Sequence, residues 1–483
     1  MDKMHKPLRT LVNAAVLSII AVNAAHSAGF SLYGESNGAA IGNYAAGLAA
    51  EAADASTGWY NPAGLVLIHE QQFVFSGVGI FPSTSLNGTS TFTTLAPPNP
   101  NPINYVQTFS DLTTAENGFV PSFHYALPLG PRATFGLSVT SPFGLSSDFV
   151  PDSAVRYEAT YSELITVNVS PELGVLLTDN FSFGAGLDLQ YARVKFNRML
   201  GAPTIAQLFV PDDPSVLDSL SYNKGHSYGV GFHAGVMGMF HDNHTRVGLN
   251  YQSEMNHTFY GFSRLTGDLA SLSNIFDPGT YTSGTFTSNN LFSNHIKLPS
   301  IVTLSAYQDV NDKLALLGSV VFTGWNVFQT IQLNNVAAAV VNPPGLPVGT
   351  ILPSVLNASS PQNYDDAWRV MVGANYHVND RLMLRVGGGY DQTPTNDTDR
   401  DVRLPDSDRV AIAIGARYWL KPNISVDAGY SHLFGVNAGG IDRTDIAGET
   451  SIYNVVADFS SSADLVGLQL NWAMDQPVAA PMK

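Results

Sequence analysis

Apolar and polar residues alternate strictly through residues 409–436. One face of the first half carries Val410, Ile412, Ile414, Ala416 and Tyr418, and the other carries Arg409, Ala411, Ala413, Gly415 and Arg417. The pattern resumes after the polar turn at 420–423, with Ile424, Val426, Ala428 and Tyr430 on one face. A period of two with one apolar face predicts two β-strands, each lying between an apolar medium and a polar one.

Short polar turns recur along the chain and alternate with long segments rich in Gly, Pro, Ser and Asn. The six turns lie at 128–132, 177–180, 241–245, 310–313, 378–381 and 420–423. The long segments lie near 81–117, 146–162, 199–224, 263–295, 333–362 and 437–460. Six turns join twelve strands, and one more strand at each end gives about fourteen, an even number typical of single-chain membrane barrels.

Aromatic residues near the strand ends favour a barrel in a membrane over a soluble β-sandwich, because membrane barrels carry aromatic girdles at both interfaces. They are Tyr191, Tyr376, Tyr390, Tyr418, Trp419 and Trp472. We therefore predict an all-β protein, a transmembrane β-barrel of about fourteen antiparallel strands over residues 70–472. Its expected location is the outer membrane of a Gram-negative cell, which it crosses many times. We expect a monomer in contact with outer-membrane lipid and lipopolysaccharide.

The two ends of the chain do not follow the strand pattern. Lys3, Lys6 and Arg9 precede an apolar run, and Ala25-His26-Ser27 offers small residues for cleavage, so residues 1–27 are predicted to be a signal peptide. An uncleaved anchor is the alternative, but the run is short for a membrane helix of about 20 residues. The last strand ends at Trp472, and no role is predicted for the tail at 473–483.

Residues 28–69 lack alternation and consist largely of Gly and Ala, beginning Ala28-Gly29-Phe30. Such a segment has too few bulky residues to form a core alone. A fourteen-stranded barrel is wide enough to need a plug unless it is an open pore. We therefore predict that these residues form a hatch inside the lumen.

Composition narrows the possible functions. Charged residues are only 13%, and the net charge of −16 argues against a nucleic-acid partner. The absence of cysteine excludes disulfides and thiolate metal sites. His241 and His244 share a turn without a third ligand, so no metal site is predicted, and no phosphate-binding loop indicates a cofactor. Ser431 and His432 point to opposite faces of a strand, so we expect no hydrolase, and no enzyme.

Several motifs, taken in order, resemble one family. They are "AGF" at the mature start, "AAEAADAST" and "WYNPAGL" in the N-terminal segment, "SPFGLSSDF", "YARVKF", "YQSEM", and "YDQTP" with "RLPDSDR". Together they resemble the FadL/TodX (OMPP1) family of outer-membrane transporters of long-chain fatty acids or hydrophobic aromatic compounds. The resemblance implies passive uptake of a hydrophobic small molecule, a hatch in the lumen, and a kinked third strand that opens the wall sideways.

The kink would fall at Pro142, Phe143, Gly144 and Leu145, because proline cannot donate to a ladder and glycine weakens a strand. The residues alone allow a second interpretation, in which the strand simply ends before a loop. In the hatch, Asn61-Pro62-Ala63 is expected to act as an anchor. Pro62 would fix φ, and Asn61 would hydrogen-bond to neighbouring backbone.

Two apolar loop segments are candidates for cargo capture, as in the family. One contains Leu208 and Phe209; the other places Leu265, Leu269, Leu272 and Phe276 at helical spacing. These side chains could instead pack on one another.

By parity, Phe196 and Arg198 face the lumen, and Arg198 aligns with a family arginine near the fatty-acid carboxylate. An arginine paired with a lumen aspartate is the alternative, and Gln332 stands where the family has a second basic residue. This departure leaves room for neutral cargo. An open pore for polar solutes and a barrel whose loops bind a partner remain alternative functions.

Overall fold

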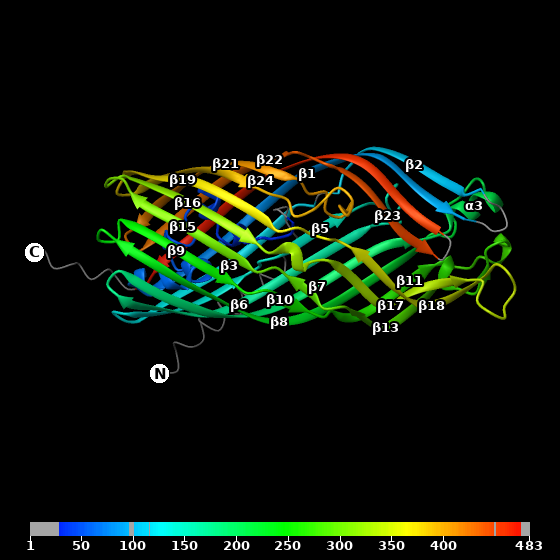
Figure 1. The fold of residues 1–483 in the computed structure, drawn as a ribbon, viewed down its shortest axis with the longest axis horizontal. Coiled ribbons are helices and arrows are strands. Elements are labelled where there is room, and N and C mark those ends of the chain that lie inside the picture. Colours follow the sequence, from blue (N-terminus) through cyan, green and yellow to red (C-terminus); the bar gives the residue numbers. More distant parts are fainter. Residues whose placement is uncertain (1–28, 96–100, 115, 449–450, 475–483) are drawn as a thin grey trace, which may run out of the picture.

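The computed structural model describes residues 29–95, 101–114, 116–448 and 451–474 and shows a closed antiparallel β-barrel (Figure 1). The barrel closes where β1 (Gln72–Thr94) pairs along its whole length with β24 (Ser451–Ala473). The predicted signal peptide, Ala28 and most of the predicted tail lie outside the described residues.

The predicted fourteen-stranded wall is confirmed. After β1 it continues through β3 (Gly118–Gly130) and a third strand made of β4 (Ala133–Thr140) and β5 (Gly144–Asp148). The other strands, in order around the wall to β24, are β6 (Tyr161–Thr178), β7 (Phe181–Leu200), β8 (Ser219–Phe240), β9 (Thr245–Gln252), β15 (Ile301–Asp309), β16 (Leu314–Thr323), β19 (Ala367–Asn379), β20 (Leu382–Asp391), β21 (Asp408–Lys421) and β22 (Ile424–Val436).

All six predicted turns join neighbouring wall strands at one end of the barrel. The opposite end, on the right of Figure 1, is built from the long segments. These segments are themselves largely paired strands rather than the loops expected. They contain β2 (Ile103–Leu112), β11 (Tyr260–Gly267), β13 (Gly284–Ser293), β17 (Thr330–Val341), β18 (Thr350–Pro361) and β23 (Gly440–Gly448). Smaller elements there are α3 (Pro203–Phe209), β10 (Met255–His257), β12 (Ser273–Asn274), β14 (Ile296–Leu298), η4 (Asp268–Ala270), η5 (Pro278–Thr280) and η6 (Trp325–Val327).

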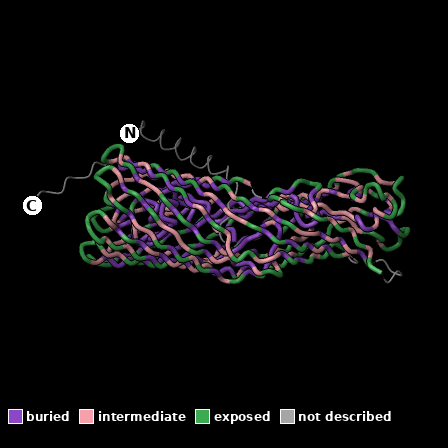
Figure 2. Tube along the Cα trace, turned by 90° about the horizontal axis from the view of Figure 1, so that it is seen from above, coloured by how far each residue is buried: buried purple, intermediate pink, exposed green. Residues whose placement is uncertain are grey.

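Burial alternates along the wall strands as the sequence predicts (Figure 2). On β7, Phe181, Phe183, Leu187 and Leu189 are exposed, whereas Ser182, Asp188 and Gln190 are buried. The exposed row is apolar because it faces hydrocarbon, and the buried row is polar because it faces the lumen. Among the described residues, no helix combines the length and apolar composition needed to span a bilayer.

The residues from Gly29 to His69 lie against the inward face of the wall. They form short turns of helix, namely η1 (Gly34–Ser36), η2 (Ala40–Asn43), α2 (Thr57–Tyr60) and η3 (Pro62–Leu67), and most of their side chains are buried. Glycines on the wall admit this backbone, since a Cβ on Gly415 would lie 2.6 Å from the Cα of Gly42. We call residues 29–69 the N-terminal segment.

The third strand is interrupted at Ser141-Pro142-Phe143. Its pairing with β6 skips from Thr140 opposite Asn168 to Gly144 opposite Ile165, so four steps on one strand match three on the other. This extra residue is a β-bulge. The pairing of β4 with β3 ends at Val139, and no ladder joins β5 to β3 within the described parts of the chain. The strand therefore continues past Pro142 but leaves its neighbour.

Candidate functional site

The N-terminal segment occupies the edge of the third strand that β3 leaves free. Gly144 donates its backbone N–H to the carbonyl of Phe30 at 2.9 Å, and Leu32 donates to the carbonyl of Pro142 at 2.7 Å. Ser31 lies directly opposite Phe143 between these two bonds. The backbone groups freed by the interrupted ladder are thus satisfied by a piece of chain from the lumen.

An aromatic cluster surrounds this contact. The ring of Phe30 lies 4.7 Å from that of Trp325 and 5.2 Å from that of Phe328, measured between centroids. Phe143 stands 6.1 Å from Phe30, and Tyr364 completes the cluster. All five side chains are buried. Edge-to-face pairs of this kind stabilise by roughly 0.5–1.5 kcal/mol each beyond the burial of area.

A carboxylate holds the start of the described chain. The backbone N–H of Gly29 donates to Oδ2 of Asp406 at 2.8 Å, and the hydroxyl of Thr393 donates to the same oxygen at 2.6 Å. Burial raises the pKa of Asp406, and Arg409 beside it acts in the opposite direction. Asp406 belongs to the motif at 403–409, so that stretch positions the N-terminal segment.

Asn61 joins the N-terminal segment to itself and to the wall. Its Nδ2 donates to the carbonyl of Ala49 at 2.7 Å and to that of Val236 on β8 at 3.1 Å, and its Oδ1 accepts from the N–H of Ala63. Asn61 is fully buried, and Pro62 begins η3. These are the backbone hydrogen bonds expected from the sequence.

Charged and polar side chains of the wall also hold the N-terminal segment. Arg417 on β21 lies 2.8 Å from Asp54 and 2.9 Å from Asp427 on β22. Nearby, Asn375 on β19 donates to Glu51 at 2.8 Å. These contacts bind the segment to strands β21 and β19.

His233 on β8 makes a further link between wall and segment. Its Nδ1 lies 3.0 Å from Asp188 and its Nε2 lies 3.1 Å from the carbonyl of Gly58. Glu172 is fully buried 3.7 Å from Nε2. The ring of Trp59 packs edge-on against the imidazole at 5.7 Å.

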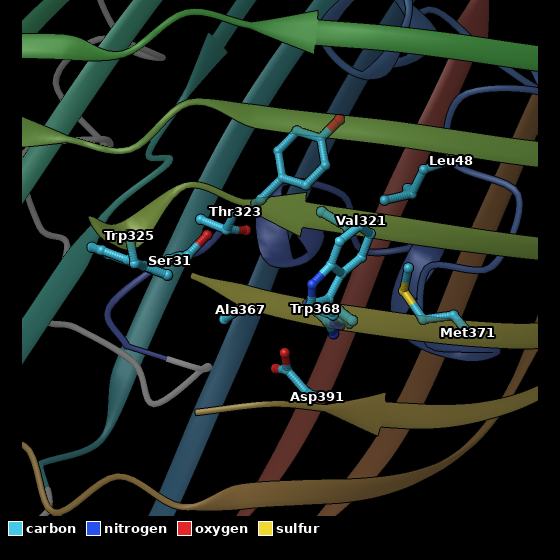
Figure 3. Close-up of a pocket in the computed structure, with 11 residues that line it drawn as sticks. Ser31, Leu48, Val321, Thr323, Trp325, Ala367, Trp368, Met371 and Asp391 are labelled. Carbon is cyan, nitrogen blue, oxygen red and sulfur yellow. The ribbon is translucent and has the colours of Figure 1, made fainter. Parts of the chain in front are cut away.

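A cavity lies between the N-terminal segment and strands β16, β19 and β20 (Figure 3). Leu48, Val321 and Met371 give it apolar walls, while Arg369 and Asp391 are charged. Arg369 stacks on the ring of Tyr44 at 4.3 Å and lies 3.7 Å from Glu35. Asp391 in turn lies 3.9 Å from Arg409, so both charged groups of the cavity already have partners. No cluster of metal-ligating side chains is found in the described residues.

The prediction of a helical apolar face at 264–276 is wrong. Residues 260–267 continue as β11, and only Asp268–Ala270 forms a 3₁₀ turn. Leu265 and Leu269 are buried, whereas Leu272 and Phe276 are 65% and 44% exposed. Pairing of β11 with β8 and β13 overrides the local helical spacing, and Gly267 at φ 136° cannot continue a helix.

The exposed members of the two segments share a corner of the barrel end. The ring of Phe209, at the end of α3, lies 5.5 Å from that of Phe276. Leu208 and Leu272 are exposed on the same two segments. These four residues are called the apolar loop patch. Leu265 and Leu269 thus pack inward, as one of the two alternatives expects, whereas contact of the exposed patch with cargo stays a prediction.

Arg198 lies on β7 opposite Ser221, partly buried, beyond the point where burial alternates regularly. Its side chain makes no ion pair or hydrogen bond with the rest of the described chain, although Asp445, Glu158 and Asp401 lie near enough to favour its charged form and so act to raise its pKa. Burial and the nearby Arg403 lower its pKa. Phe196 packs against the main hydrophobic cluster, and Gln332 is exposed on β17.

Sequence reasoning missed the aromatic cluster, Asp406 and the Arg417–Asp54 pair. The motifs containing Phe30 and Asp406 were visible, but nothing in their spacing shows that they meet. Only Trp325 and Phe328, two aromatics at the end of a strand, offered a local signal.

Comparison with known proteins shows which family has this sequence and architecture. Residues 18–474 match the family model described as outer membrane protein transport protein (OMPP1/FadL/TodX). The long-chain fatty acid transport protein of Salmonella typhi is 27% identical over 442 residues, which cover 89% of this chain and 93% of that protein. Outer membrane protein P1 of Haemophilus influenzae is 26% identical, over 97% of this chain and 100% of the relative.

Solved structures show the same fold. The crystal structure of a Pseudomonas aeruginosa FadL homologue superposes with a TM-score of 0.73 at 23% identity, covering 91% of this chain and 98% of that one. The Pseudomonas putida toluene transporter TodX gives a TM-score of 0.59 at 13% identity, covering 93% and 99%. The relatives are transport proteins rather than enzymes, and they belong to the outer membrane. The chain is a member of the OMPP1/FadL/TodX family of outer-membrane transport proteins.

Proposed function

We propose that the protein takes up long-chain fatty acids or related hydrocarbons across the outer membrane and releases them sideways into the bilayer through the break in the third strand. Uptake of hydrophobic molecules is the general activity of the family. The observation that carries the route is the backbone contact of Phe30 and Leu32 with Gly144 and Pro142. The wall at that point is completed by a segment that can leave, rather than by a neighbouring strand.

Capture begins at the apolar loop patch. Apolar cargo gains roughly 0.8 kcal/mol for each CH₂ that leaves water, so binding at Phe209 and Phe276 needs no energy source. The cargo then enters the lumen, with Phe196 as an apolar contact. Arg198 makes no ion pair with the described residues, so a cargo carboxylate could bind it by charge-assisted hydrogen bonds, in competition with the nearby Asp445, Glu158 and Asp401.

The N-terminal segment acts as the hatch. In the state described here, Phe30 fills the aromatic cluster beside the break, where cargo would otherwise lie. Cargo that competes for this cluster displaces Phe30, frees the edge of the third strand, and opens the route past Pro142. The anchor at Asn61 and the pairs at Asp54 and Glu51 keep the rest of the segment in the lumen.

A reversible lock tests this route. Ser31 and Phe143 lie opposite each other as a non-hydrogen-bonded antiparallel pair. The two Cα atoms of such a pair are about 4.5 Å apart. That distance suits a disulfide, and the chain has no native cysteine. The double variant Ser31→Cys with Phe143→Cys should transport when reduced and stop when oxidised.

Uptake of a labelled fatty acid by cells displaying the variant is the measurement, and each single cysteine variant is the control. Full uptake by the oxidised, cross-linked protein would exclude this route.

A further inference from the structure

A row of cations follows the aromatic girdle on the outer face of the barrel. On β7 the outward positions run from Phe181 through Leu187 and Leu189 to Tyr191, and then to Arg193 and Lys195. Ten residues of a strand tilted at about 40° span roughly 25 Å, the height of the apolar band of such barrels. Arg193 and Lys195 therefore lie just above the outer edge of the hydrocarbon.

Neighbouring strands repeat this order. On β8, Tyr228 is 76% exposed and contacts the ring of Tyr191 at 5.4 Å between centroids. His226 and Lys224 follow on the same face, towards the loop end. Arg264 is exposed on β11, which pairs with β8 at this height. We call Arg193, Lys195, Lys224 and Arg264 the basic belt.

The register places like charges together. Lys195 lies directly opposite Lys224 in the ladder between β7 and β8, and Arg193 lies opposite His226. Like charges at directly opposed positions destabilise a sheet. A chain with a net charge of −16 has gathered these cations where they repel one another, which points to an anion that offsets the repulsion.

The acidic residues nearby neutralise only part of the belt. Glu163 on β6 lies 2.8 Å from Arg193 and 3.2 Å from Lys195. Glu116 contacts Ser146 on the far side, next to β5. Lys224 and Arg264 have no ion pair with any described residue. The unpaired positive charge is therefore concentrated on β8 and β11.

We propose that the basic belt is a binding site for the phosphate groups of a phosphorylated glycolipid of the outer leaflet, with the acyl chains lying on the apolar band below. The basic belt lies just above the hydrocarbon, at the depth where lipid headgroups lie. Guanidinium and ammonium groups both bind phosphate well. Val230 and Phe232, 67% and 51% exposed beneath Tyr228, offer the acyl chains an apolar surface.

The test compares ligands on the full-length exported protein in detergent. Bisphosphorylated lipid A is titrated against the protein, with enzymatically dephosphorylated lipid A and inorganic phosphate as separate arms. The variant is Lys224→Gln with Arg264→Gln, which loses no ion pair and should fold normally. The matched control is Lys313→Gln with Lys421→Gln, exposed cations of the turns at the other end.

Each belt cation removed should weaken binding of phosphorylated lipid A about five-fold, so the double variant should lose roughly 25-fold, because one basic residue at a lipid surface contributes about 1 kcal/mol. The control variant should bind as the wild type does. Equal affinity of the double variant and the wild type, or of the two forms of lipid A, would overturn the proposal. Saturation by inorganic phosphate at the concentrations effective for the lipid would assign the belt to a free anion instead.

Discussion

Single side chains decide whether the N-terminal segment stays in place. Asn61 makes three hydrogen bonds from a fully buried position, one of them to the wall at Val236. Asn61→Ala leaves the carbonyls of Ala49 and Val236 without these donors. Such losses cost about 1–3 kcal/mol for each buried group left unsatisfied. We expect the Asn61→Ala variant to be displayed normally on the cell surface. Its uptake of labelled fatty acid should fall, because the N-terminal segment would be held less firmly than in the wild type. Unchanged uptake at equal surface levels would contradict the anchoring role.

Arg198 offers a test of whether the cargo carries a negative charge. If the cargo is a fatty acid, Arg198→Ala should weaken binding by roughly 1.5–3 kcal/mol, the range for hydrogen bonds to a charged group. The methyl ester of the same acid, which has no carboxylate, should bind both proteins equally. Binding of the acid and the ester to the purified protein and its variant is the measurement. An equal loss for both ligands would show that Arg198 supports the loops rather than the carboxylate.

The break in the third strand leaves β5 without a ladder to β3 among the described residues. Pro142→Thr with Gly144→Val restores a donor and adds β-branched side chains, both of which favour regular pairing. The straightened strand should still be exported, and it should still bind cargo at the apolar loop patch. Transfer of cargo into the membrane should fall, because the edge that Phe30 now covers would turn towards β3. Pro171→Thr, which changes a proline of the neighbouring β6, is the matched control. Wild-type transport by a normally displayed double variant would exclude the break as the exit.

The wall could be predicted from sequence because its determinants are local. The alternation at 409–436 and the six polar turns each depend on residues adjacent in the chain, and the strands end where those turns predict. The far end differs because pairing there is set by distant partners. Residues 264–276 have apolar residues at helical spacing, yet the first of them, up to Gly267, have a ladder with β8 on one side and with β13 on the other. The contact of Phe30 with Gly144 joins positions more than a hundred residues apart, so no local pattern reveals it.

The barrel and the N-terminal segment inside it are held together by two different kinds of contact. On one side, aromatic rings around Phe30 pack against the break in the wall. On the other, the carboxylates of Asp54 and Glu51 bind side chains of β19, β21 and β24. Apolar cargo can compete for the rings but not for the ion pairs. If the proposed route holds, the segment should yield at the break first and remain in the lumen, whereas an open pore for polar solutes needs a lumen that is not blocked.

Ion conductance distinguishes these two possibilities, and Asp54 is the residue to change. Its carboxylate accepts from Arg417 and Gln469, each at 2.8 Å, and from the hydroxyl of Ser56 at 2.6 Å. Asp54→Ala removes both bonds to the wall, those from Arg417 and Gln469, while Arg417 keeps its pair with Asp427, so the wall should remain folded. Each charged hydrogen bond contributes about 1.5–3 kcal/mol, enough in sum to release this side of the segment.

In planar bilayers we expect the wild type to be nearly silent and the variant to show frequent openings. Asp312→Asn, at an exposed turn, is the control and should behave as the wild type does. A wild-type protein that conducts steadily would instead identify an open pore, and a silent Asp54→Ala variant would show that the aromatic contacts alone hold the segment in the lumen.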